Sequence, residues 1–221
     1  GEIDSGLLAG SDSLNQVLDS TAATVDIRLQ SPMDQWQVIF TSGTTGNPKG
    51  VVMPNIAFGG WGYLGQMFGY VDGDRPYTGL SLTHGNAQGV TLGPSLNLGL
   101  RGVFSRRFTK SKLLDVCRTY GCTTFSILGG MATAIYSEPL KADDADNPVR
   151  VVASAGMPHA IWESFEKRFG VDISEWYGAV EGGFAFKPVG VGPIGSFGKP
   201  GPETEMKILD ENDNECDVGV M

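Results

Sequence analysis

Residues 41–50 concentrate groups that could hold a chain of phosphates. The segment contains three glycines, whose backbone can bend and present N–H groups to oxygen atoms. Ser42, Thr44 and Thr45 add hydroxyl donors, and Lys49 adds one positive charge. A Walker A loop carries serine or threonine directly after its lysine, whereas a glycine follows Lys49. The composition therefore predicts a polyphosphate cradle of a different kind, rather than an ordinary glycine–threonine turn.

The composition of the whole chain excludes several other classes of function. The 221 residues include 16 basic and 25 acidic side chains, which gives a net charge of −9. Because no basic face stands out, we expect no nucleic acid partner. The apolar runs are too short to predict a membrane span. Three cysteines make neither a disulfide framework nor a zinc pattern, and two histidines exclude a histidine-rich metal site. An odd cysteine count fits a reducing compartment, so we expect a cytoplasmic protein.

Strands and helices that alternate along the chain must position the cradle. Residues 37–41 form an apolar run, typical of a buried strand that ends in the phosphate loop. Further strands are predicted at 51–53, 77–82, 122–128, 149–154 and 171–177, and helices at 56–68, 111–120, 130–136 and 160–169. This order predicts an α/β fold with a mainly parallel sheet covered by helices on both faces.

The pattern changes near the end of the sequence. Residues 187–202 are rich in glycine and proline, and residues 205–209 alternate between polar and apolar side chains. We therefore expect residues 1–186 to form the central α/β part and residues 187–221 to begin a smaller antiparallel β subdomain.

Five segments resemble, in order, the motifs of the adenylate-forming superfamily, which includes acyl-CoA synthetases, luciferases and peptide-synthetase adenylation domains. Residues 41–50 resemble its phosphate-loop signature, and residues 83–87 its looser motif near the acyl pocket. Residues 154–158 resemble the segment that lines the adenine, and residues 175–181 resemble the Tyr-Gly-x-Thr-Glu motif with valine in place of threonine. Residues 194–200 resemble a Gly-Lys-Pro stretch. The resemblance is strongest to acyl-CoA synthetases of the carnitine-, bile-acid- and fatty-acid-CoA ligase group.

The resemblance implies an activity and a set of site residues. A small carboxylic acid would react with ATP to give an acyl-adenylate, and coenzyme A would then take the acyl group as a thioester. The resemblance makes Thr44 and Glu181 catalytic, with Glu181 as the Mg²⁺ ligand, and places His84 and Asn86 in the acid pocket. The implied ATP-binding residues are Thr41, Ser42, Gly43, Thr44, Thr45, Gly46, Lys49, Ala155, Gly156, Met157, Trp176, Tyr177 and Gly178.

The resemblance also implies a partial adenylation domain. The family's ribose-binding aspartate, hinge and C-terminal catalytic lysine would lie beyond Met221, so we expect the isolated chain to be an inactive fragment of a large N-terminal domain. Two alternatives stay open: an amino-acid or aryl-acid adenylation domain of a carrier-protein system, and a nucleotide-binding module without catalysis. A homodimer is possible.

Overall fold

The computed structural model describes residues 31–41, 47–201, 204–217 and 219. The chain divides into two units, Gly1–Ser31 and Pro32–Met221, and every helix and strand described below belongs to the second.

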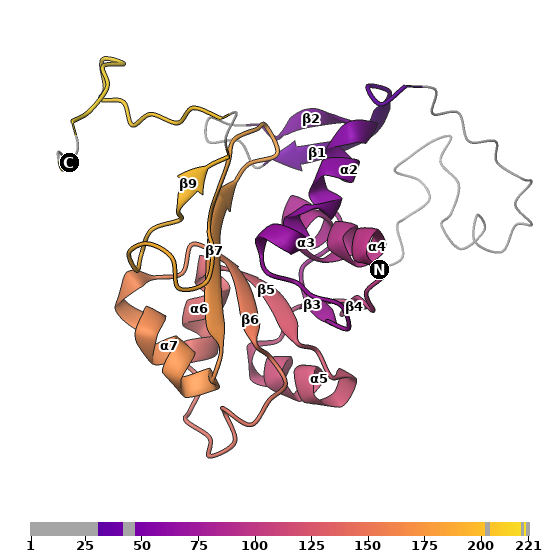
Figure 1. Cartoon of the computed structure of the whole chain (residues 1–221), viewed down its shortest axis with the longest axis vertical. Coiled ribbons are helices and arrows are strands. Elements are labelled where there is room, and N and C mark those ends of the chain that lie inside the picture. Colours follow the sequence, from indigo (N-terminus) through magenta and orange to yellow (C-terminus); the bar gives the residue numbers. More distant parts are fainter. Residues whose placement is uncertain (1–30, 42–46, 202–203, 218, 220–221) are drawn as a thin grey trace, which may run out of the picture. The chain divides into compact units, whose positions relative to one another are not determined.

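A seven-stranded sheet forms the centre of this unit, with the strand order β4-β3-β5-β6-β7-β8-β9 (Figure 1). The first five strands of this order run parallel, and β8 and β9 continue the sheet in the antiparallel sense. The strands are β3 (Pro76–Thr78), β4 (Val103–Phe104), β5 (Thr124–Leu128), β6 (Val151–Ala155), β7 (Asp172–Gly178), β8 (Phe184–Lys187) and β9 (Lys199–Pro200). The predicted α/β class with a mainly parallel sheet is confirmed.

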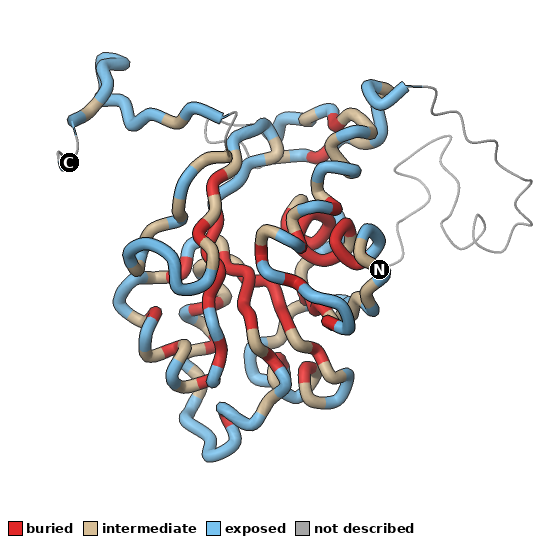
Figure 2. The backbone as a smooth tube through the Cα atoms, in the orientation of Figure 1, coloured by how far each residue is buried: buried red, intermediate tan, exposed pale blue. Residues whose placement is uncertain are grey.

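Helices cover both faces of the sheet, because alternate residues of each strand point to opposite sides. Phe125, Val152 and Ile173 are buried in a core with α5 (Leu113–Tyr120), α6 (Gly129–Tyr136) and α7 (Trp162–Phe169). The other face is covered by α3 (Leu64–Met67), the π-helix η1 (Ala87–Leu92) and α4 (Gly93–Leu98), and α2 (Asn55–Gly62) packs against η1 and α4. Two 3₁₀ turns, η2 (Lys110–Lys112) and η3 (His159–Ile161), precede α5 and α7. Figure 2 shows buried residues along the central strands.

The strand expected at 37–41 is present, but the expectation that it is buried is wrong. Strand β1 (Gln35–Thr41) pairs only with β2 (Lys49–Pro54), as an antiparallel hairpin separate from the main sheet. Ile39 on its inner face is buried, whereas Phe40 on its outer face is 72% exposed. A two-stranded sheet has one covered face, so half of an apolar strand stays in contact with solvent.

Two further expectations differ from the structure. The predicted helix 56–68 is divided into α2 and α3 at Tyr63, in a stretch that contains four glycines. Glycine lowers helix stability by about 1 kcal/mol relative to alanine, which favours a break there. The predicted strand 77–82 is reduced to β3, because the chain turns at residues 81–84, where His84 N–H donates to the Ser81 carbonyl at 2.9 Å.

Candidate functional site

A pocket of about 890 Å³ opens at the carboxyl ends of the parallel strands. Leu128, Ala155 and Gly178, the last residues of β5, β6 and β7, form its floor, and the β1–β2 hairpin and Trp61 of α2 contribute to its walls. In open α/β sheets ligands bind at this edge, because the loops that follow the strands converge there.

The structure brings many of the predicted site residues to this pocket. It is lined by Thr41, His84, Asn86, Ala155, Trp176, Gly178 and Glu181. Lys49 is exposed and lies opposite Thr41 in the hairpin register, so the two residues flank the predicted phosphate loop. The loop residues Ser42, Gly43, Thr44, Thr45 and Gly46 lie outside the described residues.

Besides Lys49, three described residues that were predicted to bind ATP do not line the pocket. Met157 is 5% exposed and packs into the core beneath α7. Tyr177 is half exposed, and its ring centroid lies 5.5 Å from that of Phe197. Gly156 is exposed beside the pocket residue Ala155. A nucleotide that reaches Gly156 and Tyr177 would therefore extend from the pocket onto the adjoining surface.

In the loop at 83–86, the His84 ring contacts the backbone of Asn86. His84 Nδ1 accepts a hydrogen bond from the Asn86 N–H at 3.1 Å, so a neutral His84 ring carries its proton on Nε2. Asn86 is 3% exposed, and neither its Oδ1 nor its Nδ2 has a partner among the described residues. The Nε1 of Trp176 is likewise buried without a partner in that part of the chain. Buried polar atoms of this kind are normally satisfied, which marks the pocket as a place for a polar ligand group or water.

Two glutamines join the hairpin to η1. The Nε2 of Gln37 donates to Oε1 of Gln88 at 2.7 Å, and the Nε2 of Gln88 donates to Oε1 of Gln37 at 3.1 Å. The same Nε2 of Gln88 also donates to the Leu82 carbonyl at 2.7 Å. Sequence reasoning could not find this pair, because the partners lie 51 residues apart and no motif links them.

Glu181 and Val180 follow β7 at the mouth of the pocket. Glu181 is exposed and has no hydrogen-bond or ion-pair partner within the described ranges. Over those same ranges no three acidic, histidine or cysteine side chains gather as a metal cluster. Val180 lies close to the acid-pocket loop: a Cβ on Gly85 would come 3.0 Å from its Cγ1.

A comparison with protein families identifies the family of the chain. The model of the AMP-binding enzyme family matches residues 4–220. The chain belongs to this family. Among curated relatives, a medium/long-chain-fatty-acid–CoA ligase of Mycobacterium marinum is 35% identical over 197 residues, which cover 86% of this chain and 38% of the relative. The chain thus spans about two fifths of the length of that relative.

Solved structures of two CoA ligases share the fold. A benzoate CoA ligase from Burkholderia xenovorans superposes with a TM-score of 0.78 at 20% identity, covering 93% of this chain and 42% of that one. The o-succinylbenzoate CoA synthetase from Bacillus subtilis, solved with ATP and magnesium, superposes with a TM-score of 0.72 at 21% identity, covering 92% and 43%. Within the described ranges, each helix of the AMP-binding chain is too short or too polar to cross a membrane.

Proposed function

We propose that the complete natural polypeptide is an AMP-forming acid–thiol ligase that activates a carboxylic acid with ATP. The observation that carries this proposal is the convergence of Thr41, His84 and Glu181 on one pocket in a chain that belongs to the AMP-binding family. These residues come from the three segments to which the resemblance assigns phosphate, acid and metal binding.

The proposed reaction has two steps. A carboxylate oxygen of the acid attacks the α-phosphorus of ATP, and the bond from that phosphorus to the pyrophosphate oxygen breaks. The thiol of coenzyme A then attacks the acyl carbon, releases AMP and gives its proton to solvent. Reactions at phosphorus depend mainly on positioning and on neutralising charge, which fits a site with a single histidine, His84. In this proposal the loop 41–46 and Lys49 bind the β- and γ-phosphates, and residues 155–157 and 176–178 receive the adenine.

Glu181 fits a role as a magnesium ligand. Magnesium prefers oxygen ligands and is commonly bound by one or two carboxylates together with substrate phosphates and water. An exposed carboxylate at the pocket mouth that has no protein partner in the described part of the chain matches this pattern. Bound magnesium would neutralise charge on the phosphate oxygens. We therefore propose Mg²⁺ as the metal.

We propose a fatty acid as the substrate class. The Mycobacterium marinum relative is named a medium/long-chain-fatty-acid–CoA ligase, and it is 35% identical to this chain. The pocket offers the apolar lining that an alkyl chain requires: Ile39, Met53, Trp61, Leu64, Val90 and Phe184. The benzoate and o-succinylbenzoate ligases are 20% and 21% identical and support the shared fold alone.

The proposal also covers the location of the protein, a second subdomain and the oligomeric state. A cytoplasmic location is favoured by Cys117, Cys122 and Cys216, which are all free thiols. A smaller β subdomain that begins at residue 187 stays a proposal. Strands β8 and β9 extend the main sheet, so such a subdomain would be continuous with it. A homodimer is a further prediction, to be measured by light scattering.

The proposed function is tested by pyrophosphate release in the complete natural polypeptide. Release should require both ATP and a fatty acid, and AMP and acyl-CoA should accumulate when coenzyme A is added. Lys49→Ala should raise the KM for ATP about tenfold, the worth of one charge-assisted phosphate contact. Lys112→Ala is the matched control, because Lys112 is an exposed lysine in η2, away from the pocket lining. An unchanged KM for ATP in Lys49→Ala would contradict the phosphate cradle. ATP binding without pyrophosphate release would favour the non-catalytic module.

A further inference from the structure

Glu175 of β7 is a buried carboxylate for which the sequence motifs assign no role. Glu175 is 4% exposed and pairs with Ser154 of β6 in the strand register. Oε1 accepts hydrogen bonds from the backbone N–H groups of Gly156 and Met157, the latter at 3.1 Å. Oε2 lies 3.2 Å from the same Met157 nitrogen. One carboxylate thus binds two consecutive N–H groups of the segment that follows β6.

The segment is confined from a second side by the start of α6. A Cβ on Gly129 would come 2.3 Å from the Gly156 carbonyl oxygen, so only glycine permits this approach of the two backbones. Gly156 itself has a φ of +92°, a conformation that glycine adopts without strain. Residues 155–157 therefore hold an unusual backbone conformation between Gly129 and the Glu175 carboxylate.

The charge of Glu175 is not neutralised by a direct ion pair in the described part of the chain. Lys187 lies opposite Glu175 in the register of β8, but its Nζ lies 4.9 Å from the ring centroid of Trp162. Burial raises the pKa of Glu175 above its ordinary value, against the opposing effects of the hydrogen bonds and of Lys187. A buried carboxylate without a close cation opposes folding when ionised, so stability does not account for an acidic residue here.

We propose that Glu175 is a positioning residue for nucleotide binding, whose carboxylate holds the backbone of residues 155–157 in the conformation that receives the adenine. This inference rests on the proposed function, which gives residues 155–157 to the adenine. Ala155 reaches the pocket directly, whereas the Gly156 and Met157 N–H groups are occupied by Glu175. The carboxylate therefore acts on the nucleotide through the segment and does not need to touch it.

The test compares two glutamates of the complete natural polypeptide, each of which accepts hydrogen bonds from backbone N–H groups. Glu166 Oε1 accepts a hydrogen bond from the Ile173 N–H at 3.0 Å, at the amino end of the same strand β7 and away from the pocket. Glu175→Gln keeps the shape but replaces one acceptor oxygen with a donor, and Glu166→Gln makes the same chemical change at the control site. KM for ATP, KM for the acid and kcat are measured from pyrophosphate release, and the melting temperature is measured without nucleotide.

We expect Glu175→Gln to raise the KM for ATP about tenfold, with a smaller change in kcat and in the KM for the acid. Glu166→Gln should leave the KM for ATP unchanged, and Glu175→Asp should recover part of the loss. An unchanged KM for ATP in Glu175→Gln, or an equal change in Glu166→Gln, would overturn the inference while the proposed function stands. So would a failure of both Glu175 variants to fold, because Glu175 would then be required for folding. Absence of pyrophosphate release in the wild-type enzyme would overturn the proposed function, and this inference with it.

Discussion

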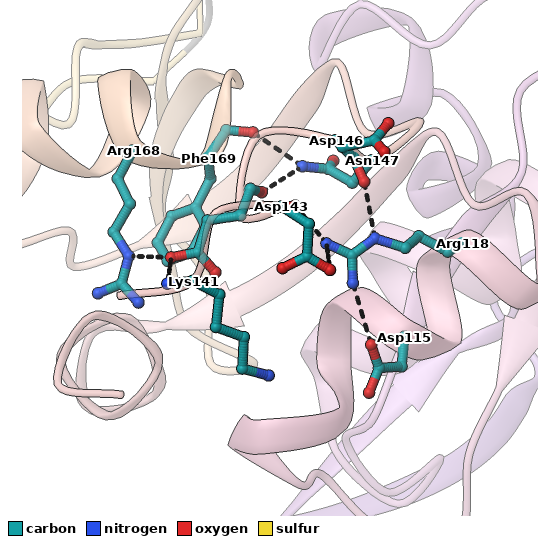
Figure 3. Close-up of polar contacts among 9 residues, drawn as sticks. Asp115, Arg118, Lys141, Asp143, Asp146, Asn147, Arg168 and Phe169 are labelled. Carbon is teal, nitrogen blue, oxygen red and sulfur yellow. Dashed lines mark hydrogen bonds and ion pairs between the residues drawn. The ribbon is translucent and has the colours of Figure 1, made fainter. Parts of the chain in front are cut away.

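At the amino end of strand β6, Arg118 and Arg168 bind the chain segment 137–150 (Figure 3). At the carboxyl end of the sheet, by contrast, buried polar atoms of the pocket lack partners among the described residues. Arg168 of α7 is the more buried of the two arginines. Its Nε donates to Asp144 Oδ2 at 2.7 Å, its Nη1 to the Tyr136 carbonyl at 2.6 Å, and its Nη2 to the carbonyls of Glu138 and Pro139. The side chains of Arg168 and Asp144 are each 8% exposed.

Arg118 of α5 binds the same segment from the other side. Its Nε donates to the Asp146 carbonyl at 2.7 Å, and its Nη2 donates to the Asp143 carbonyl at 2.5 Å. Its Nη1 donates to Asp115 Oδ1 at 3.0 Å. Asn147 completes the network by donating to the carbonyls of Asp144 and Phe169, each at 2.9 Å. In this network all three nitrogens of each guanidinium group donate to an oxygen of the chain itself.

The pocket end is built in the opposite way. The Asn86 amide and Trp176 Nε1 are buried there without partners in the described part of the chain. A buried group left unsatisfied lowers stability by about 1–3 kcal/mol, a penalty that a ligand can remove on binding. The difference teaches that the Arg118 and Arg168 network contributes stability to the fold, whereas the unpartnered groups of the pocket lower it and remain open to a ligand or water.

The largest effect is expected for Arg168→Ala. Removing the arginine leaves Asp144 as a buried charge and strips three carbonyls of their donor, so the free energy of unfolding should fall by about 3–5 kcal/mol. Urea unfolding measures the loss. Arg106→Ala, at an exposed arginine, is the control and should change the free energy by less than about 0.5 kcal/mol. If Arg168→Ala raised the KM for ATP and left the free energy of unfolding unchanged, the proposed difference between the two regions would be contradicted.

A smaller effect is expected in the pH dependence of the unfolding free energy, which should differ between Asp74 and Glu175. Burial by itself would raise the pKa of Asp74, but hydrogen bonds from Arg150, Thr123 and the Val71 N–H hold it below its ordinary value of 3.8. Its stabilising contribution is therefore present above pH 3.8 and is lost as the pH falls through the lower value of the folded state. Asp74→Asn should flatten the fall of the unfolding free energy below about pH 4, measured by urea unfolding across pH.

Glu175 should show the opposite sign. Its raised pKa means that its contribution is complete below 4.5 and is lost as the pH rises through the higher value of the folded state. Glu175→Gln should therefore reduce the loss of stability above pH 4.5 and leave the acid limb unchanged. Two carboxylates that respond with the same sign would contradict the difference between the two ends.

The smallest expected effect is a gain from Val180→Thr. Threonine has nearly the shape of valine, so its contact with Gly85 should persist, and the new hydroxyl can donate to a phosphate oxygen. Pyrophosphate release with the native acid should rise about fivefold, the worth of one hydrogen bond of about 1 kcal/mol. A clear loss of activity would mean that the apolar contact with Gly85 matters more than a donor at this position.

Much of the fold could be predicted from local pattern. Strands β5 and β6 are short, mainly apolar runs, β7 places Ile173 and Trp176 among polar residues, and α7 carries an apolar stripe, so their positions follow from the sequence to within a few residues. The buried helical stretch of η1 and α4 could not be found, because its glycines and proline argue against a helix. Packing beneath α2 overrides that propensity. The exposure of Phe40 depends on which strand β1 pairs with, and no local pattern carries that information.

The site divides in the same way. His84, Asn86, Trp176 and Glu181 lie in segments with recognisable motifs, and the topology of the sheet brings those segments to one pocket. Their chemical roles stay predictions. The Gln37–Gln88 pair and the bonds of Glu175 could not be predicted, since each depends on the relative placement of distant backbone segments.

The order of the strands has a consequence for how the sheet is assembled. Each strand from β5 to β8 pairs with the strand that follows it in the chain, whereas β3 joins β5 across the intervening β4 and α5. Neighbours that are close in the sequence lose little chain entropy when they meet, and the entropy loss grows slowly with the length of the closed loop. The sheet from β5 onward can therefore grow strand by strand in the order of translation, and the attachment of β3 is its one long-range closure within the described strands.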